Sequence, residues 1–145
     1  MNTIRVKKLN VNAIIPTYGS TEAAGADLYA CLSAPLTVLP GEVAWVGTGI
    51  ALEVPKGCAG LVYARSGMAC KRGLAPANKV GVVDSDYRGE ITVVLLNHGN
   101  QPQTIMPGER IAQFVITPVL TPAYEEVLNL DETDRGTGGF GSTGK

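Results

Sequence analysis

The chain has 145 residues, of which 45% are apolar and 17% charged, and its formal net charge is -1. This length fits one domain with a real core, and the charge argues against nucleic acid as the main partner. No apolar run approaches the roughly 18 residues of a membrane span, and MNTIRVKKLN lacks the apolar core of a signal peptide. We therefore expect a cytoplasmic protein with no membrane partner, and the low charged fraction favours an oligomer.

Short segments rich in β-branched residues alternate with glycine and proline turns along the chain. In chain order, strands are expected within 3–9, 26–31, 36–39, 42–46, 49–54, 60–64, 79–84, 90–96 and 110–116. Pro-Gly turns are expected at 39–42 and 106–109, another turn at 54–57, and one short helical turn at 66–73. No helical period is sustained over three turns, so the pattern predicts an all-β sandwich or barrel.

The run Val93-Val94-Leu95-Leu96 is apolar at consecutive positions. Such a run predicts a strand that is buried on both faces. The second face is expected to meet either the other sheet of a sandwich or another subunit.

The cysteines and the histidine offer little chemistry. Cys31, Cys58 and Cys70 are odd in number and form no C-x-x-C pair, so neither a disulfide framework nor a zinc site is expected. We interpret them as packing residues. The single histidine, His98, lies in the turn-like stretch NHGNQP and is expected in a solvated loop, which sets aside a His-dependent triad.

Two polar residues interrupt apolar strands, and two polar clusters follow strand ends. A partly buried Asp27 is expected to pair with an arginine or a metal-bound water, and a buried Gln113 also needs a partner. The stretch ARSG at 64–67 is either a phosphate-binding corner or an ordinary surface turn. The stretch DSDYRG at 84–89 is either a hairpin turn or the mouth of a site in which Asp84 accepts a proton from water.

The chain ends on RGTGGFGSTGK at 135–145. Its glycines match G-x-G-x-x-G and the start of a P-loop, but both motifs need a following helix, so we reject them. One interpretation is a disordered terminus. The other is a lid, because glycine N–H groups can form an anion nest and Phe140 offers a face for stacking a base. Ordering costs on the order of 10 kcal/mol, which favours a nucleoside triphosphate as the ligand that would offset it.

Five stretches in order resemble the motifs of the trimeric dUTPase family, the dUTP pyrophosphatases: AGADLYA, ARSG, NKVGVVDSDYRGE, GERIAQ and RGTGGFGSTG. They run from residue 24 to 144. The resemblance implies a jelly-roll-like β core over 1–134, a mobile lid over 135–145, and a homotrimer with active sites at subunit interfaces. It also implies hydrolysis of dUTP to dUMP and pyrophosphate, which limits uracil incorporation into DNA and supplies dUMP for dTMP synthesis.

Roles follow from this resemblance residue by residue. Asp84 matches the carboxylate that activates the attacking water, and Asp27 the supporting acidic residue of the first motif. Tyr87 matches the residue that packs under the deoxyribose and excludes a ribose 2′-hydroxyl. The uracil-reading segment corresponds to Asn78, Val82 and Val83, with Thr92 nearby.

The resemblance assigns the remaining residues to the triphosphate. The matched phosphate contacts in the body are Arg65, Ser66, Gly67 and Gln113. In the tail, Phe140 would stack on uracil, and the residues that would wrap the β- and γ-phosphates are Arg135, Gly141, Ser142 and Thr143. Mg²⁺ would be held by phosphate oxygens and water, without direct protein ligands.

The sequence departs from the family pattern at two positions beside the site, and two alternatives stay open. Ala64 stands where many members carry proline, and Val83 where isoleucine is more usual. One alternative is a dCTP deaminase-like enzyme of the same fold, which would be longer and need a glutamate base. The other is a non-catalytic trimeric β regulatory protein. The combination of Asp84 with Tyr87 favours the pyrophosphatase.

Overall fold

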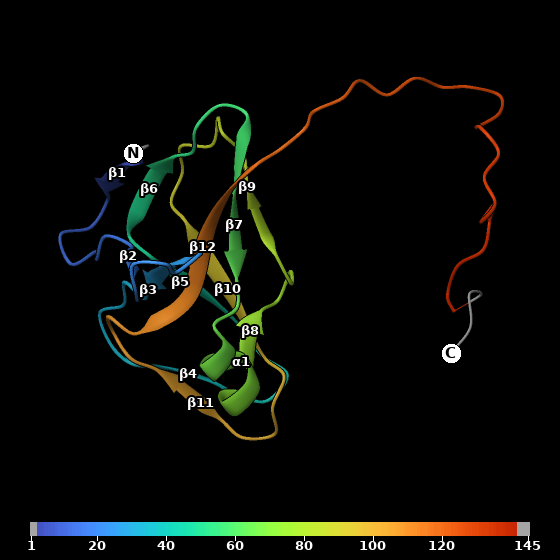
Figure 1. Cartoon of the computed structure of the whole chain (residues 1–145). Coiled ribbons are helices and arrows are strands. Elements are labelled where there is room, and N and C mark those ends of the chain that lie inside the picture. Colours follow the sequence, from blue (N-terminus) through green and yellow to red (C-terminus); the bar gives the residue numbers. More distant parts are fainter. Residues whose placement is uncertain (1–2, 142–145) are drawn as a thin grey trace.

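The computed structural model describes residues 3–141, which form twelve short strands and one helix (Figure 1). The elements are β1 (Arg5–Lys8), β2 (Thr17–Tyr18), β3 (Ala26–Tyr29), β4 (Leu36–Val38), β5 (Val43–Gly47), β6 (Ile50–Glu53), β7 (Cys58–Tyr63), α1 (Ser66–Arg72), β8 (Leu74–Pro76), β9 (Gly81–Val83), β10 (Thr92–Asn97), β11 (Gln103–Ile105) and β12 (Arg110–Pro118). The expected all-β class is confirmed, and each of the nine expected strands is present.

All strand pairs are antiparallel. The largest sheet has the order β2-β3-β12-β7-β9, and a second sheet has the order β5-β10-β8. Two smaller pairs, β1 with β6 and β4 with β11, complete the body. Both larger sheets contribute fully buried side chains to one core, including Leu28 from β3 and Val46 and Leu95 from β5 and β10. This is the layered, jelly-roll-like arrangement that the resemblance implied.

Glycine conformation fixes the turns that the sequence predicted. Gly41, Gly57 and Gly108 have φ values of 80°, 81° and 75°, in the left-handed region that a type II turn requires at its third position. The turn in 54–57 closes one residue later than expected, because the Cys58 N–H donates to the carbonyl of Pro55. The predicted helical turn is the seven-residue helix α1, which ends at Gly73 with a φ of 71°.

The prediction that both faces of β10 are buried is wrong for the single chain. Val93, Leu95 and Asn97 are buried, whereas the alternate residues Thr92, Val94 and Leu96 are only half-buried. On the same outer face of the sheet, the β5 neighbours Val43 and Trp45 are 48% and 74% exposed. Within residues 3–141, this outer apolar face is therefore left largely open to solvent at Val43 and Trp45.

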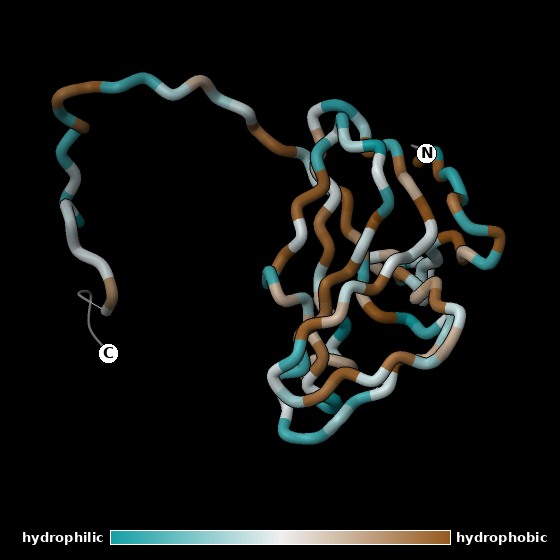
Figure 2. The backbone as a smooth tube through the Cα atoms, turned by 180° about the vertical axis from the view of Figure 1, so that it is seen from behind, coloured by the Kyte–Doolittle hydropathy of each residue, from teal (hydrophilic) through white to brown (hydrophobic). Residues whose placement is uncertain are grey.

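After Pro118 the chain leaves the body and runs outward, as Figure 1 shows in orange to red. We call residues 119–141 the C-terminal arm. Its last backbone hydrogen bond to the body joins the Val119 N–H to the carbonyl of Gly57. Figure 2 shows that the arm carries hydrophobic stretches, and Leu120, Tyr124 and Leu128 are almost fully exposed. The division into a core over 1–134 and a lid over 135–145 stays a prediction.

The three cysteines have free thiols in this structure. Cys31 and Cys58 are half-buried and pack at the edge of the core, but Cys70 is exposed on α1, so its interpretation as a packing residue is wrong. His98 is exposed in a loop, as predicted, and its backbone N–H donates to the carbonyl of Gly73. Within residues 3–141, the helix content offers nothing long and apolar enough to cross a membrane.

Candidate active site

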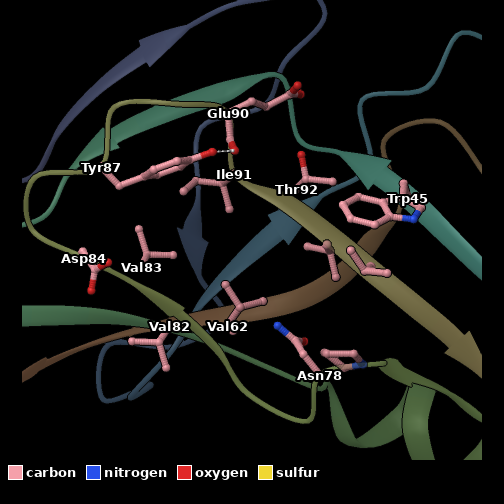
Figure 3. Close-up of a pocket in the computed structure, with 14 residues that line it drawn as sticks. Trp45, Val62, Asn78, Val82, Val83, Asp84, Tyr87, Glu90, Ile91 and Thr92 are labelled. Carbon is pink, nitrogen blue, oxygen red and sulfur yellow. Dashed lines mark hydrogen bonds between the residues drawn. The ribbon is translucent and has the colours of Figure 1, made fainter.

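A cavity of about 340 Å³ opens beside β9, β10 and the loop that joins them (Figure 3). Six of the predicted site residues line it: Asn78, Val82, Val83, Asp84, Tyr87 and Thr92. The structure therefore brings together the residues assigned to the base, the sugar and the attacking water. The remaining lining residues were not predicted: Trp45, Val62, Pro76, Gly81, Glu90, Ile91, Val93 and Val94.

Strand β9 forms one wall of the cavity and is the edge strand of the large sheet. It pairs with β7, with Gly81 opposite Val62. A Cβ on Gly81 would lie 3.1 Å from the Val62 Cβ, so glycine allows the two strands to approach closely here. The side chain of Val83 packs against the core, whereas Val82 is 65% exposed. One side of the β9 backbone therefore remains free of strand pairing and borders the cavity.

The turn between β8 and β9 places Asn78 at the cavity. Lys79 has a φ of 67°, which is uncommon for a residue with a side chain. Two hydrogen bonds hold this geometry: the Lys79 N–H donates to the Pro76 carbonyl at 3.0 Å, and the Val80 N–H to the Asn78 carbonyl at 2.8 Å. The chain therefore reverses within three residues, and Asn78 lies between the two strands that it connects.

Asp84 directly follows β9, as the sequence predicted, and its side chain is exposed at the mouth of the cavity. The loop after it is a tight turn, since the Tyr87 N–H donates to the Asp84 carbonyl at 3.2 Å. The Tyr87 hydroxyl donates to the Glu90 carbonyl at 3.1 Å, and Arg88 Nη1 donates to two carbonyls of the same loop. The turn at 84–89 joins β9 to β10, which pair with other strands and not with each other, so the interpretation of DSDYRG as a hairpin turn is wrong. Its interpretation as the mouth of a site stays a prediction, with Asp84 and Tyr87 both lining the cavity.

A second group of predicted residues lies on β3, β12 and the end of β7. Asp27 is 9% exposed and accepts hydrogen bonds from Arg65 Nε at 2.8 Å and Arg110 Nη1 at 3.3 Å. Gln113 stands opposite Asp27 in the sheet, and its Nε2 donates to the Ala64 carbonyl at 2.8 Å. The expected pairing of Asp27 with an arginine and the expected partner for Gln113 are both confirmed. We call Asp27, Arg65, Arg110 and Gln113 the arginine cluster.

The single chain does not join this cluster to the cavity. The cavity lining does not include Asp27, Arg65 or Gln113. It also does not include Ser66 and Gly67, which are exposed at the start of α1. In the arm, Arg135 Nε donates to the carbonyl of Gly138 at 2.8 Å, and Phe140 and Gly141 are exposed. Ser142 and Thr143 lie outside the described residues. The predicted site is therefore divided among three separate regions of one chain.

Over residues 3–141, no three histidine, cysteine, aspartate or glutamate side chains gather closely enough to hold a metal ion. Mg²⁺ usually keeps several waters and binds through few carboxylates together with substrate phosphates, so the donor set is compatible with an ion carried by a nucleotide.

A sequence model of the dUTPase family matches residues 11–144. The chain belongs to the dUTPase family. The resemblance predicted from the five motifs is thereby confirmed, together with the enzyme class that it implies, since the match includes the cavity, the arginine cluster and the arm.

Relatives within the dUTPase family cover nearly the whole chain. The deoxyuridine 5′-triphosphate nucleotidohydrolase of Syntrophotalea carbinolica is 49% identical, covering 98% of this chain and 97% of the relative. That of Desulfitobacterium hafniense is also 49% identical and covers 99% of both chains.

Two solved dUTPase structures share the fold. The dUTPase of Staphylococcus bacteriophage 80alpha, solved with dUPNHPP, has a TM-score of 0.91 and 29% identity, covering 100% of both chains. A mutant dUTPase from phage phi11 of S. aureus has a TM-score of 0.80 and 25% identity, covering 88% of this chain and 98% of the phage chain. The phi11 structure is described with coordination of a structural Mg(II) ion.

The two departures from the dUTPase pattern leave the polar geometry in place. Ala64 contributes only its carbonyl, which a proline would also offer to Gln113. Sequence reasoning missed Trp45, Glu90 and Arg110. Trp45 stands between Ala44 and Val46, which face the core. Because side chains alternate along a strand, this position places the large Trp45 ring on the outer face. Arg110 lies within GERIAQ, three residues before Gln113, but its pairing with Asp27 depends on cross-strand register.

Proposed function

We propose that this chain hydrolyses dUTP to dUMP and pyrophosphate, with Asp84 as the general base. The observation that carries the proposal is the cavity, which is lined by Asp84, Tyr87 and Asn78 together with the residues of the edge strand β9. The relatives named deoxyuridine 5′-triphosphate nucleotidohydrolase, at 49% identity over nearly the full length, support the same substrate.

The edge of β9 is suited to reading a base. Backbone N–H and C=O groups on an unpaired strand edge present alternating donors and acceptors, as the Watson–Crick edge of a base does. We assign uracil to this edge, with the Asn78 amide beside it. Val83, which packs against the core, and Val62 on the neighbouring strand β7 both line the cavity and would narrow the space, which would disfavour a 5-methyl group. Tyr87 would then lie under the deoxyribose and leave no room for a 2′-hydroxyl.

Asp84 is placed to act on the α-phosphate. A nucleoside held against β9 would direct its 5′-phosphate toward the mouth of the cavity, where the Asp84 carboxylate is exposed. The carboxylate would accept a proton from water while the water oxygen attacks the α-phosphorus. The bond from the α-phosphorus to the oxygen bridging to the β-phosphorus breaks, and pyrophosphate leaves with that oxygen.

The arginine cluster would bind the phosphates. Arg65 presents a guanidinium fork that the buried carboxylate of Asp27 holds in place, and forks of this kind match phosphate oxygens. Ser66, Gly67 and Gln113 would add hydrogen-bond donors. Mg²⁺ bound to the triphosphate oxygens and water would neutralise the charge that develops during transfer. Arg135, Phe140 and Gly141 in the arm, together with Ser142 and Thr143 after it, would close over the nucleotide.

We further propose that the site is completed in a cytoplasmic homotrimer. Three features support this assembly: the division of the predicted site within one chain, the outer apolar face around Val43, Trp45, Val94 and Leu96, and the exposed apolar side chains that the C-terminal arm carries among its acidic residues. Such apolar surface usually marks an interface. Sedimentation should give three times the chain mass, and a stable active monomer would contradict shared sites.

The activity test compares the wild type with Asp84→Asn. Pyrophosphate release should occur with dUTP and be much weaker with dCTP, dTTP and UTP. Asp84→Asn should keep dUTP binding but lose about 10²–10⁴-fold in kcat, the usual contribution of a general base. Retained turnover would refute the role of Asp84, and ammonia release from dCTP would favour a deaminase.

A further inference from the structure

We propose that Gly89 and Glu90 are positioning residues that set the sugar selectivity of the cavity by holding the ring of Tyr87. This inference rests on the proposed function, in which the Tyr87 ring excludes a ribose. Neither residue needs to touch the nucleotide for the effect, because both act through the tyrosine. Figure 3 shows the Tyr87 hydroxyl pointing to the Glu90 carbonyl, while the Glu90 carboxylate points away from the ring.

Gly89 provides the space that the Tyr87 ring occupies. A Cβ on Gly89 would lie 2.6 Å from Tyr87 Cζ and 3.0 Å from Cε2, and it would also collide with the hydroxyl oxygen. Carbon atoms in contact stand about 3.5–4.0 Å apart, so the ring would have to move by roughly 1 Å. Any side chain at this position therefore displaces the wall that is assigned to the deoxyribose.

Glu90 holds the other end of the ring through its backbone. The Tyr87 hydroxyl donates to the Glu90 carbonyl at 3.1 Å, so the position of that carbonyl fixes the ring. The Glu90 carboxylate is itself held, because its Oε1 accepts the Gly49 N–H at 2.7 Å. A Cβ on Gly47 would lie 2.5 Å from the same oxygen, so a second glycine makes room for this carboxylate.

The turn between β5 and β6 anchors the whole arrangement. Thr48, which is 1% exposed, donates to the Ile91 carbonyl through its hydroxyl at 2.6 Å and its N–H at 3.1 Å. The Ile91 N–H in turn donates to the carbonyl of Ile50 at 2.9 Å. The segment Glu90–Ile91 is thus bound to a turn that lies far away in the sequence, and the loop carrying Tyr87 takes its position from that turn.

The first test is Gly89→Ala, with Gly19→Ala as the matched control. Nothing lies within 4 Å of a Cβ on Gly19, and the structure records no positive φ at either glycine. The readout is the ratio of kcat/KM for dUTP to kcat/KM for UTP, measured on the full chain. We expect Gly89→Ala to lower this ratio about tenfold and Gly19→Ala to leave it unchanged. A tenfold loss is smaller than the discrimination that a well-fitted pocket usually achieves by excluding one hydroxyl.

The second test uses Glu90 and does not depend on the folding of Gly89→Ala. Glu90→Gln keeps a side-chain oxygen that can accept the Gly49 N–H, whereas Glu90→Ala removes it. The ratio should fall in Glu90→Ala and be retained in Glu90→Gln. A residue that merely supported folding would change the amount of active enzyme, but it would leave this ratio constant, since both substrates report on the same folded molecules.

A double-mutant cycle decides whether the effect passes through the ring. In a Tyr87→Ala background, Gly89→Ala should cause no further change in the ratio. An unchanged ratio in Gly89→Ala alone, or an equal fall in the Tyr87→Ala background, overturns the inference while the proposed function stands. A wild type that releases no pyrophosphate from dUTP, or that does not discriminate against UTP, removes the proposed function and this inference with it.

Discussion

Replacing Asp27 with asparagine should destabilise the protein far more than breaking an exposed ion pair. The Asp27 and Arg65 side chains are 12% and 26% exposed, and their contact is 2.8 Å long. Asparagine removes the charge and turns an amide NH₂ group toward one of two guanidinium groups. Losing the charge-assisted bond to Arg65 costs about 1.5–3 kcal/mol, and the contact to the half-exposed Arg110 adds about 0–1 kcal/mol.

The free energy of unfolding should therefore fall by about 1.5–4 kcal/mol. For a chain of this size, that corresponds to a decrease in Tm of roughly 3–16 °C. The assay is thermal unfolding at one fixed protein concentration, because oligomerisation makes Tm depend on concentration. On the same samples, KM for dUTP should rise more than kcat falls, since Arg65 loses the carboxylate that orients it toward the phosphates.

The control is Glu53→Gln, which breaks the exposed pair between Arg5 and Glu53 together with a longer contact of 4.0 Å between Glu53 and the exposed Arg88. The Arg5 and Glu53 side chains are 81% and 37% exposed, and such a pair is worth at most about 1 kcal/mol. Its Tm should fall by less than roughly 4 °C. If Asp27→Asn melts at the wild-type temperature, or if both variants lose the same amount, the argument from burial is refuted.

Three other perturbations have defined outcomes. Deleting residues 135–145 should leave Tm unchanged, because the hydrogen bonds of residues 135–141 stay within the arm. The same deletion should lower kcat/KM about 10–100-fold, because the stacking of Phe140 is lost. An unchanged kcat/KM would refute the lid. Asn97→Ala should lower the free energy of unfolding by about 2–4 kcal/mol in denaturant unfolding. The buried Asn97 side chain donates from Nδ2 to the carbonyls of Val38 and Gln101, and its Oδ1 accepts the Gly99 N–H. A loss below about 1 kcal/mol would contradict this expectation. Lys79→Gly should raise the free energy of unfolding by about 1 kcal/mol in the same assay, since glycine adopts a φ of 67° without strain. A destabilised variant would show that contacts of the lysine side chain stabilise the turn instead.

The sequence predicted the long strands because their signal is local. Runs such as EVAWV and RIAQFVI carry β-branched residues between turn residues, and each became a strand. It missed β2, β8 and β11, which have only two or three residues and one of which ends in proline. The three-residue strands β4 and β9 were predicted because they lie within the apolar runs LTVL and KVGVVD, whereas the missed strands lack such a run and depend on the partner that they pair with. The second face of β10 is not covered within the single chain, and burial by another subunit stays a prediction, since composition cannot say which neighbour covers a face.

The candidate site could be predicted where its residues are contiguous in the chain. The stretch from Asn78 to Tyr87 is one turn, one strand and one loop, and it forms one wall of the cavity. The residues that support this wall come from elsewhere. The Glu90 carboxylate is held by the Gly49 N–H, and the Arg110 guanidinium by the Asp27 carboxylate. Such contacts depend on tertiary register, which a single sequence does not encode in any local pattern.

The position of β9 at the edge of its sheet has a consequence for how base selectivity could change over time. If the free backbone of this strand reads uracil, the recognising atoms are identical whichever side chains the strand carries. Point mutations in β9 would then alter packing or affinity while the donor and acceptor order stays the same. The exchange of isoleucine for valine at Val83 fits this view. Selectivity encoded in main chain should be robust to mutational drift, and it would be lost mainly through insertions or deletions that shift the register of Gly81 against Val62.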